Sequence, residues 1–201
     1  MIRNVVFDFG AVLFEWNPPQ IVESFTDSSY EQNLLLHEVI YHPDWVSLDR
    51  GTMLMAEEIP KFAARTGFTE SRMADFIEHI QNSLVRNTAT LALLYQVLDH
   101  DYSAYYLTNM STAFFETLNE RNSFISLFNG GLVSSKELMI KPEPDIFKLL
   151  IQRYDLAADE TLFIDDHAAN IDAAKALGFQ TVQFEPSESC INNIRVLLGI
   201  S

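Results

Sequence analysis

The sequence predicts an α/β fold, in which a Rossmann-like three-layer core with a parallel sheet carries an inserted all-helical cap domain. Three short apolar runs without alternation predict strands that are buried on both faces, as in a parallel sheet. Each run stops at polar residues that can take part in chemistry. The runs are 5–7, followed by Asp8; 104–107, followed by Thr108-Asn109; and 162–164, followed by Asp165-Asp166.

Two weaker apolar runs, 131–134 and 181–184, would complete a five-stranded sheet. Helical patterns lie between the runs, with apolar side chains three and four residues apart. Pro144 is placed to begin one helix, and Gly178 is placed to end another in the left-handed conformation. Because strands and helices alternate, we expect right-handed crossovers. The three apolar helix faces are Leu91, Leu94, Tyr95 and Leu98; Ile146, Leu149 and Leu150; and Ile171, Ala174 and Leu177.

The segment 16–87 contains helical patterns but no strand candidate. Met73, Phe76 and Ile80 repeat the helical spacing, and Gly67 is placed to end a preceding helix. We therefore predict an α/β core formed by residues 1–15 and 88–201. Residues 16–87 are predicted to form a helical cap inserted after the first strand.

Composition and charge limit the classes of binding partner that the protein can have. The chain has 201 residues, 48% of them hydrophobic, which is ample for a core, and a formal net charge of −15. We expect no nucleic-acid or anionic-membrane partner, because such binding relies on clustered Lys and Arg. The single cysteine, Cys190, and an N-terminus unlike a secretory signal indicate the cytoplasm. Nothing in the sequence predicts an oligomeric state.

Acidic residues follow two of the predicted strands. In an open parallel sheet, ligands bind beyond the carboxyl ends of the strands, so Asp8, Thr108 and Asp165-Asp166 should converge. Converging carboxylates repel one another unless a cation neutralises them, and magnesium prefers hard oxygen ligands. Proline keeps the preceding residue extended, so Lys141, which precedes Pro142, should project from a loop and supply positive charge.

Four segments, in this order, resemble the signature motifs of the haloacid dehalogenase superfamily, in members with a helical cap after the first strand. The resemblance spans nearly the whole chain. The turn Leu48-Asp49-Arg50-Gly51 also resembles a cap turn of the branch that contains α-D-glucose-1-phosphate phosphatase and the phosphatase domain of soluble epoxide hydrolase. The four segments are 5–13, 107–109, Lys141-Pro142 and 163–170.

The resemblance implies a magnesium-dependent hydrolase of a small phosphorylated metabolite. Asp8 would attack phosphorus and form an aspartyl-phosphate, with Lys141 as the second catalytic residue, offsetting the charge. Asp166, Asp8 and the backbone carbonyl of Gly10 would bind Mg²⁺. The substrate-binding residues would be Thr108, Asn109, Lys141 and, at the start of the cap, Trp16.

Gly10 departs from the family pattern. Most phosphatases of the family carry an Asp two residues after the nucleophile, which acts as general acid and then as base. General acid–base catalysis contributes about 10²–10⁴-fold, and Gly10 has no side chain to supply it. A leaving group of low basicity would suffer least, which favours a sugar 1-phosphate.

Two alternatives to a phosphatase remain. A 2-haloacid dehalogenase also lacks that Asp, but it needs no metal and would gain little from Asp165-Asp166 beside Asp8. A non-catalytic protein that binds a phosphorylated ligand is the other alternative, and Gly10 is its support. A phosphoglucomutase-like transfer is less favoured, because the missing acid is central to it.

Overall fold

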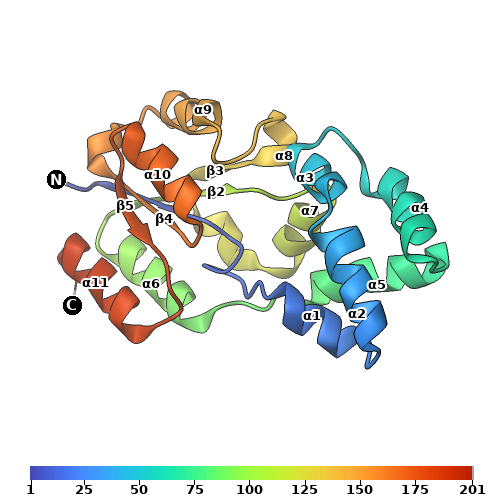
Figure 1. Cartoon of the computed structure of the whole chain (residues 1–201). Coiled ribbons are helices and arrows are strands. Elements are labelled where there is room, and N and C mark those ends of the chain that lie inside the picture. Colours follow the sequence, from blue (N-terminus) through green and yellow to red (C-terminus); the bar gives the residue numbers. More distant parts are fainter. Residues whose placement is uncertain (201) are drawn as a thin grey trace.

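The computed structural model describes residues 1–200 and contains a parallel five-stranded sheet in the order β3-β2-β1-β4-β5 (Figure 1). The predicted α/β fold class is confirmed. All five predicted strands are present. Their bounds are β1, Asn4–Phe7; β2, Ser103–Thr108; β3, Gly130–Val133; β4, Thr161–Asp165; and β5, Gln180–Gln183.

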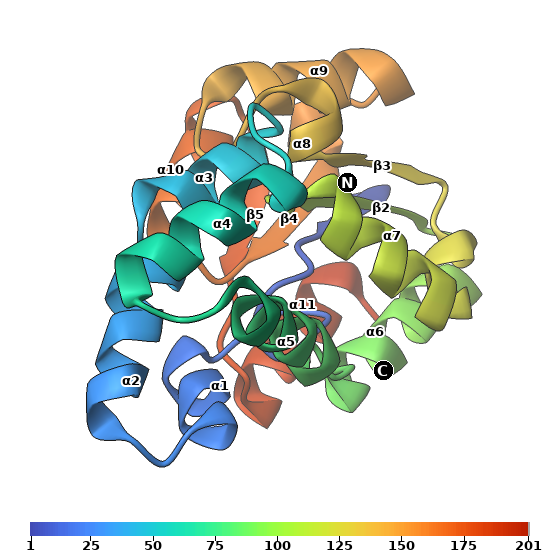
Figure 2. The ribbon, with the colours of Figure 1, turned by 90° about the vertical axis from the view of Figure 1, so that its right-hand side faces the viewer.

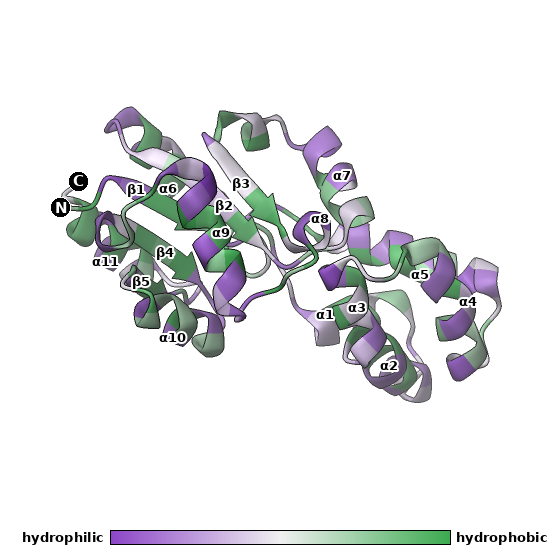
Figure 3. Ribbon diagram, turned by 90° about the horizontal axis from the view of Figure 1, so that it is seen from above, coloured by the Kyte–Doolittle hydropathy of each residue, from purple (hydrophilic) through white to green (hydrophobic). Residues whose placement is uncertain are grey.

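Helices cover both faces of the sheet and make three layers. Val5 and Phe7 of β1 pack into one apolar cluster with α6, α7 and α11, and Val6 packs into a second with α9 and α10. Figure 3 shows the central strands as hydrophobic and the surrounding helices as mixed, as burial on both faces requires. The core helices are α6, Thr88–Asp99; α7, Thr112–Arg121; α8, Ser134–Glu137; α9, Pro144–Tyr154; α10, Ala168–Ala176; and α11, Glu188–Leu198, with 3₁₀ turns η2, Ser123–Leu127, and η3, Ala158–Glu160.

Two helix ends follow the sequence prediction, and one helix face does not. Pro144 begins α9, and Gly178 adopts the predicted left-handed φ of +92° just after α10. The predicted face of α6 is wrong at Tyr95, whose exposed fraction is 44%. The same spacing, shifted by one residue, defines the buried face. That face is Thr90, Leu93, Leu94 and Val97.

The helices of residues 16–87 extend from one end of the sheet, and this segment contributes no strand to it (Figures 1 and 2). In α4, the predicted C-terminal Gly67 is left-handed, with φ +74°. In α5, the predicted apolar face is buried. The helices are α1, Pro18–Phe25; α2, Ser29–Leu35; the π-helical turn η1, Leu36–Ile40; α3, Pro43–Arg50; α4, Met55–Thr66; and α5, Glu70–Ser83.

The two chain segments that join these helices to the core run side by side. The N–H of Glu15 donates to the carbonyl of Val85 at 2.8 Å, and the N–H of Asn87 donates to the carbonyl of Leu13 at 2.8 Å. Phe14 and Arg86 form an antiparallel bridge between these bonds. The inserted helices therefore enter and leave the core at one point.

A turn at the end of α3 docks these helices against the core. The carbonyl of Asp49 accepts a hydrogen bond from the Ser134 hydroxyl. Arg50 forms a bidentate pair with Glu143, at 2.5 and 2.9 Å. Gly51 has φ +80°, and a Cβ there would overlap the carbonyl of Ser135. Within residues 1–200, no helix is long and apolar enough to cross a bilayer.

Candidate active site

A cavity of about 460 Å³ lies where the carboxyl ends of β1, β2 and β4 face the inserted helices. We call the core residues Asp8, Asn109, Lys141, Asp166 and Asn170, together with the buried Asp165 that contacts Lys141, the floor of this cavity. We call the lining residues contributed by 16–87 the roof. The strand order places β1 between β2 and β4, which brings Asp8 beside groups from both neighbours.

Lys141 is the cationic centre of the floor. Its side chain is 1% exposed, and its Nζ lies 2.9 Å from Oδ1 of Asp8 and 2.6 Å from Oδ2 of Asp165. It also donates to the carbonyl of Leu107 at 2.9 Å. Lys141 projects from its loop as predicted, but it points inward to two carboxylates and not to solvent.

Asp165 is fully buried and its oxygens are occupied by protein donors. The amide of Asn170 donates to both carboxylate oxygens, at 2.9 and 3.1 Å, and the N–H of His167 donates to Oδ1 at 2.8 Å. With Lys141 on Oδ2, both oxygens already have donors. Asp165 is therefore suited to holding Lys141 in place.

The pKa values of the floor reflect this arrangement. Burial, reinforced by the charge of Asp165, raises the pKa of Asp8 well above its ordinary value, although Lys141 opposes the rise. Burial and the charge of Asp165 also raise the pKa of Asp166. Burial works against the ionised form of Asp165, but Lys141 and Asn170 hold its pKa below the ordinary value. Three carboxyl groups thus share one lysine, and their full ionisation would leave negative charge that Lys141 alone does not neutralise.

The remaining charge fits a divalent cation. One oxygen each from Asp8, Asp165 and Asp166 lie within 4.8 Å of one another. Among the described residues, the hydrogen bonds to Asp8 engage Oδ1, from Lys141 and from the N–H of Phe9 at 2.7 Å, and none engages Oδ2. Oδ2 of Asp8 and the partly exposed carboxylate of Asp166 are thus the oxygens best placed for a hard cation.

Asn109 fixes the loop that carries Lys141. Its Oδ1 accepts the N–H of Lys141 at 2.8 Å, and its Nδ2 donates to the carbonyl of Lys141 at 2.9 Å. Thr108 is 1% exposed at the end of β2, and the residues that follow it, Asn109, Met110 and Ser111, line the cavity. Ser111 caps the N-terminus of α7 by accepting the N–H of Phe114, so this helix begins at the cavity wall.

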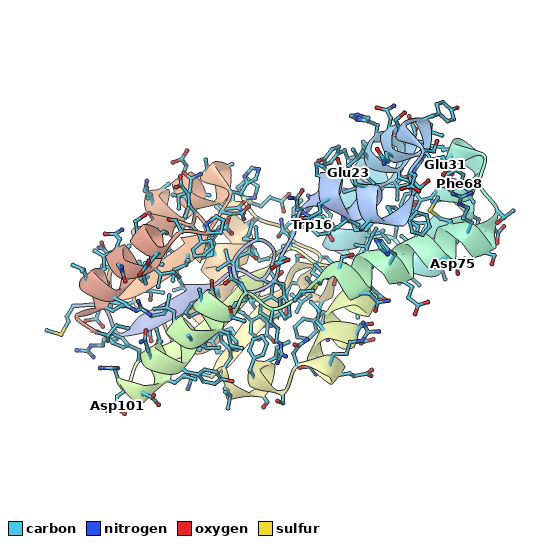
Figure 4. The ribbon with its side chains drawn as sticks, turned by 90° about the horizontal axis from the view of Figure 1, so that it is seen from below. Trp16, Glu23, Glu31, Phe68, Asp75 and Asp101 are labelled. Carbon is cyan, nitrogen blue, oxygen red and sulfur yellow. The ribbon has the colours of Figure 1, made fainter. Side chains whose placement is uncertain are left out.

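Gly10 and Trp16 face each other at the junction of core and cap. A Cβ on Gly10 would meet the Trp16 side chain at 3.9 Å, an ordinary contact distance. Figure 4 shows Trp16 at the junction between the two parts of the molecule. Trp16 stacks on Trp45 of α3 with ring centroids 6.3 Å apart, and both line the cavity. The space beside Gly10 is therefore bounded by an aromatic ring and holds no second carboxylate from β1.

The structure brings most of the predicted site residues to one cavity. Asp8, Gly10, Trp16, Asn109, Lys141 and Asp166 line it, and Thr108 is buried next to it. Two residues that carry no predicted role also belong to the site. Asp165, signalled by the tandem acids, holds Lys141. Asp49, signalled by the cap turn, lines the roof, and the nearby backbone N–H of Ser111 lowers the pKa of its carboxyl in part.

The fold and the site together define an enzyme with an acidic, lysine-containing centre on a parallel sheet, beneath a helical cap. A family model described as haloacid dehalogenase-like hydrolase matches residues 2–178, and the chain belongs to this family. The predicted family and the prediction of a hydrolase are confirmed.

Several relatives and solved structures resemble the chain. D-ribitol-5-phosphate phosphatase of Bacteroides thetaiotaomicron is 30% identical, over 99% of this chain and 100% of that protein. Sesquiterpene phosphatase astK of Aspergillus oryzae is 28% identical, over 98% of this chain and 97% of that protein. A haloacid dehalogenase family enzyme of B. thetaiotaomicron, in complex with magnesium and inorganic phosphate, superimposes with a TM-score of 0.77 at 24% identity, covering 94% of this chain and 96% of that one. L-2-haloacid dehalogenase of Xanthobacter autotrophicus gives 0.69 at 19% identity, covering 100% and 84%.

Proposed function

We propose that the protein is a magnesium-dependent phosphatase that hydrolyses a small phosphorylated metabolite through an aspartyl-phosphate on Asp8. The observation that carries the proposal is that three carboxyl groups surround Lys141 at one end of the sheet. A cation bound there would neutralise the carboxylates, and the cation and Lys141 together would neutralise a phosphoryl group. The two named phosphatases among the relatives, and the magnesium and phosphate bound in a structural neighbour, support it.

Asp8 is placed to attack phosphorus, and Lys141 is placed to oppose the charge that develops on the transferring group. Asp8, Asp166 and the carbonyl of Gly10 would hold Mg²⁺, which supplies charge neutralisation for the phosphoryl oxygens when bound. Asn109 keeps Lys141 in its extended loop, and Asp165 keeps the ammonium beside Asp8. Thr108 and the N–H of Asn109 would bind the phosphoryl oxygens. Trp16 would contact the organic part of the substrate.

The test is phosphate release from p-nitrophenyl phosphate. Turnover is expected with Mg²⁺, is expected to stop in EDTA, and is expected to be abolished in Asp8→Asn. That substitution keeps the size of the side chain and removes the nucleophile. Metal-independent turnover, or full activity in Asp8→Asn, would reject the proposal. A sugar 1-phosphate remains the substrate that the resemblance predicts, and glucose 1-phosphate belongs in the same assay.

The same purified protein tests the two alternatives to a phosphatase. Chloride release from 2-chloropropionate in EDTA would indicate a dehalogenase, whose fold the chain shares. Thermal stabilisation by inorganic phosphate and Mg²⁺ without turnover of any phosphate ester would indicate a non-catalytic binding protein. Phosphate release that requires Mg²⁺ excludes both.

A further inference from the structure

We infer that the substrate is the phosphomonoester of a predominantly apolar alcohol, whose hydrocarbon body fills the roof of the cavity. This inference rests on the proposed phosphatase function and specifies the class of alcohol. It follows from the side chains that the cap presents to the cavity.

The roof is apolar almost throughout. Of its nine residues, Asp49 is the only charged one, and Tyr41 and the two tryptophans offer one polar atom each at a ring edge. The wall continues into the core through Met110 and Phe114, and the Phe114 ring meets Trp45 edge-on at 5.8 Å. The apolar members of the roof are Trp16, Ile40, Trp45, Leu48, Met55 and Leu84, with Val46 beside them.

This surface fits a hydrocarbon better than a polyol. The phosphoryl group must lie on the floor, because Lys141 is the only Lys or Arg among residues 1–200 that lines the cavity. The rest of the substrate then faces the roof. Each hydroxyl of a sugar or sugar alcohol would lose water there and find few partners, whereas each methylene would gain by leaving water.

The apolar surface also reaches solvent. Tyr41 and Val46 line the cavity, and their exposed fractions are 54% and 48%. Exposed apolar side chains that continue a binding cavity are typical of a ligand path. The roof can therefore accept an apolar chain that extends from the floor to the rim of the cavity.

The test is a series of n-alkyl monophosphates from propyl to decyl, assayed with Mg²⁺ against glucose 1-phosphate and ribitol 5-phosphate. The series has one leaving-group chemistry, so chain length alone varies. We expect kcat/KM to rise about fourfold per methylene until the cavity is filled. The longest members should exceed both polyol phosphates. A flat series, or a preference for either polyol phosphate, would overturn the inference.

Two variants assign the effect to the roof. Val46→Thr and Met55→Gln, combined, place polar atoms in the cavity at nearly unchanged volume and should flatten the rise with chain length. Val196→Thr is the matched control, because Val196 is 78% exposed on α11 and distant from the cavity lining. An unchanged slope in the double variant would also overturn the inference. Absence of all turnover in the unsubstituted protein, including that of p-nitrophenyl phosphate, would instead reject the proposed function.

A second inference comes from a different observation, the position of Asp49. We propose that Asp49 is the general acid that protonates the leaving alcohol in place of the side chain that Gly10 lacks. In an in-line displacement the leaving oxygen lies opposite the attacking oxygen. Asp8 attacks from the floor, so the leaving oxygen faces the roof, where Asp49 is the one carboxyl group among the lining residues.

The proton balance is complete with Asp49 alone. As the bond from Asp8 to phosphorus forms and the ester P–O bond breaks, the Asp49 carboxyl gives its proton to the leaving oxygen. The Asp49 carboxylate then takes a proton from the water that attacks the aspartyl-phosphate, which releases phosphate and restores both acids. Burial raises the pKa of Asp49 to about 7, and the Ser111 N–H and the charge of Lys141 offset this only in part. The group can therefore hold a proton near neutral pH.

The test compares two leaving groups in Asp49→Asn. For octyl phosphate, whose alkoxide leaves poorly, kcat/KM should fall by about 10²–10⁴-fold. For p-nitrophenyl phosphate, whose phenolate leaves without a proton, the fall should be far smaller. Asp49→Glu should recover part of the octyl phosphate activity. Equal losses for both substrates would show a structural role and overturn the proposal.

Discussion

The floor and the roof of the cavity differ in charge and in the parts of the chain that form them. The floor comes from strand ends and loops of the core, and its charged groups are locked by paired hydrogen bonds around Lys141 and Asp165. The roof comes from inserted helices, is apolar except for Asp49, and contacts the core through a short turn, 49–51, as well as through the two tryptophans. Under the proposals above, the groups that hold the phosphoryl group and the groups that select the alcohol lie on separate parts of the chain, and Asp49 is the one roof residue placed for the chemistry.

The largest effect is expected from the floor, in Lys141→Met. Removing the only cation between Asp8 and Asp165 leaves two buried carboxylates unpaired, which should lower the free energy of unfolding by about 3–5 kcal/mol in EDTA. Phosphate release should fall by about 10²–10³-fold. Chemical denaturation and steady-state kinetics measure the two losses.

Lys148→Met is the control for this change. Lys148 pairs with Asp145 at 3.0 Å, but both side chains are more than half exposed, and exposed pairs contribute little. If both lysine variants lost the same stability, the importance assigned to the buried pair would be wrong.

An intermediate effect is expected where floor and roof meet, in Gly51→Ala. The added Cβ would overlap the carbonyl of Ser135, so the turn must shift and carry the roof with it. A displacement of about 1 Å can cost about 10²-fold in rate, and we expect a loss in kcat/KM of that order. The free energy of unfolding should fall only by the cost of placing alanine at the left-handed φ.

Gly67→Ala isolates that backbone cost. Gly67 has φ +74°, but no atom lies within 4 Å of a Cβ placed there. In both variants the left-handed alanine should lower the free energy of unfolding by about 1–2 kcal/mol, and only Gly51→Ala should lose activity. Equal kinetics in the two variants would argue that the 49–51 turn does not position the roof.

The smallest effect is expected from Arg50→Met, which removes the ion pair between the cap turn and Glu143. The two side chains are 32% and 41% exposed, so the pair should contribute about 0.2–1 kcal/mol and weaken as salt increases. A rise of a few-fold in KM is expected, measured at low and high salt. Arg153→Met, which breaks the Arg153–Glu137 pair within the core, should leave KM unchanged.

The core was largely predictable from the sequence because its signals are local. An apolar run that ends in an acid predicts both a buried strand and the edge at which the acid lies, as β1 and β4 show. The buried face of α6 was not predictable, because Leu91, Leu94 and Leu98 satisfy helical spacing as well as Leu93 and Val97 do. The choice between them depends on tertiary contacts of α6 with β2, which follows it, and with α11, which is about ninety residues further along the chain.

The candidate site divides in the same way. Asp8, Lys141 and Asp166 follow from strand ends and from a proline, and they lie together on the floor. Asp49 carried no predicted role, because its place in the cavity depends on how the inserted helices dock. That docking is set by Ser111 and Ser134, more than sixty residues further along the chain. A carboxylate in an exposed-looking turn gives no local sign of such a contact.

The bridge between Phe14 and Arg86 holds the two ends of the insertion together. Because the ends of the insertion meet, replacing 16–84 with a different module, or with a short turn, need not disturb the register of β1 against β2. Such an exchange would alter which molecules are admitted and would replace Asp49, while Asp8, Lys141 and Asp166 stay fixed, and a lineage could acquire new substrates by changing modules at this single junction.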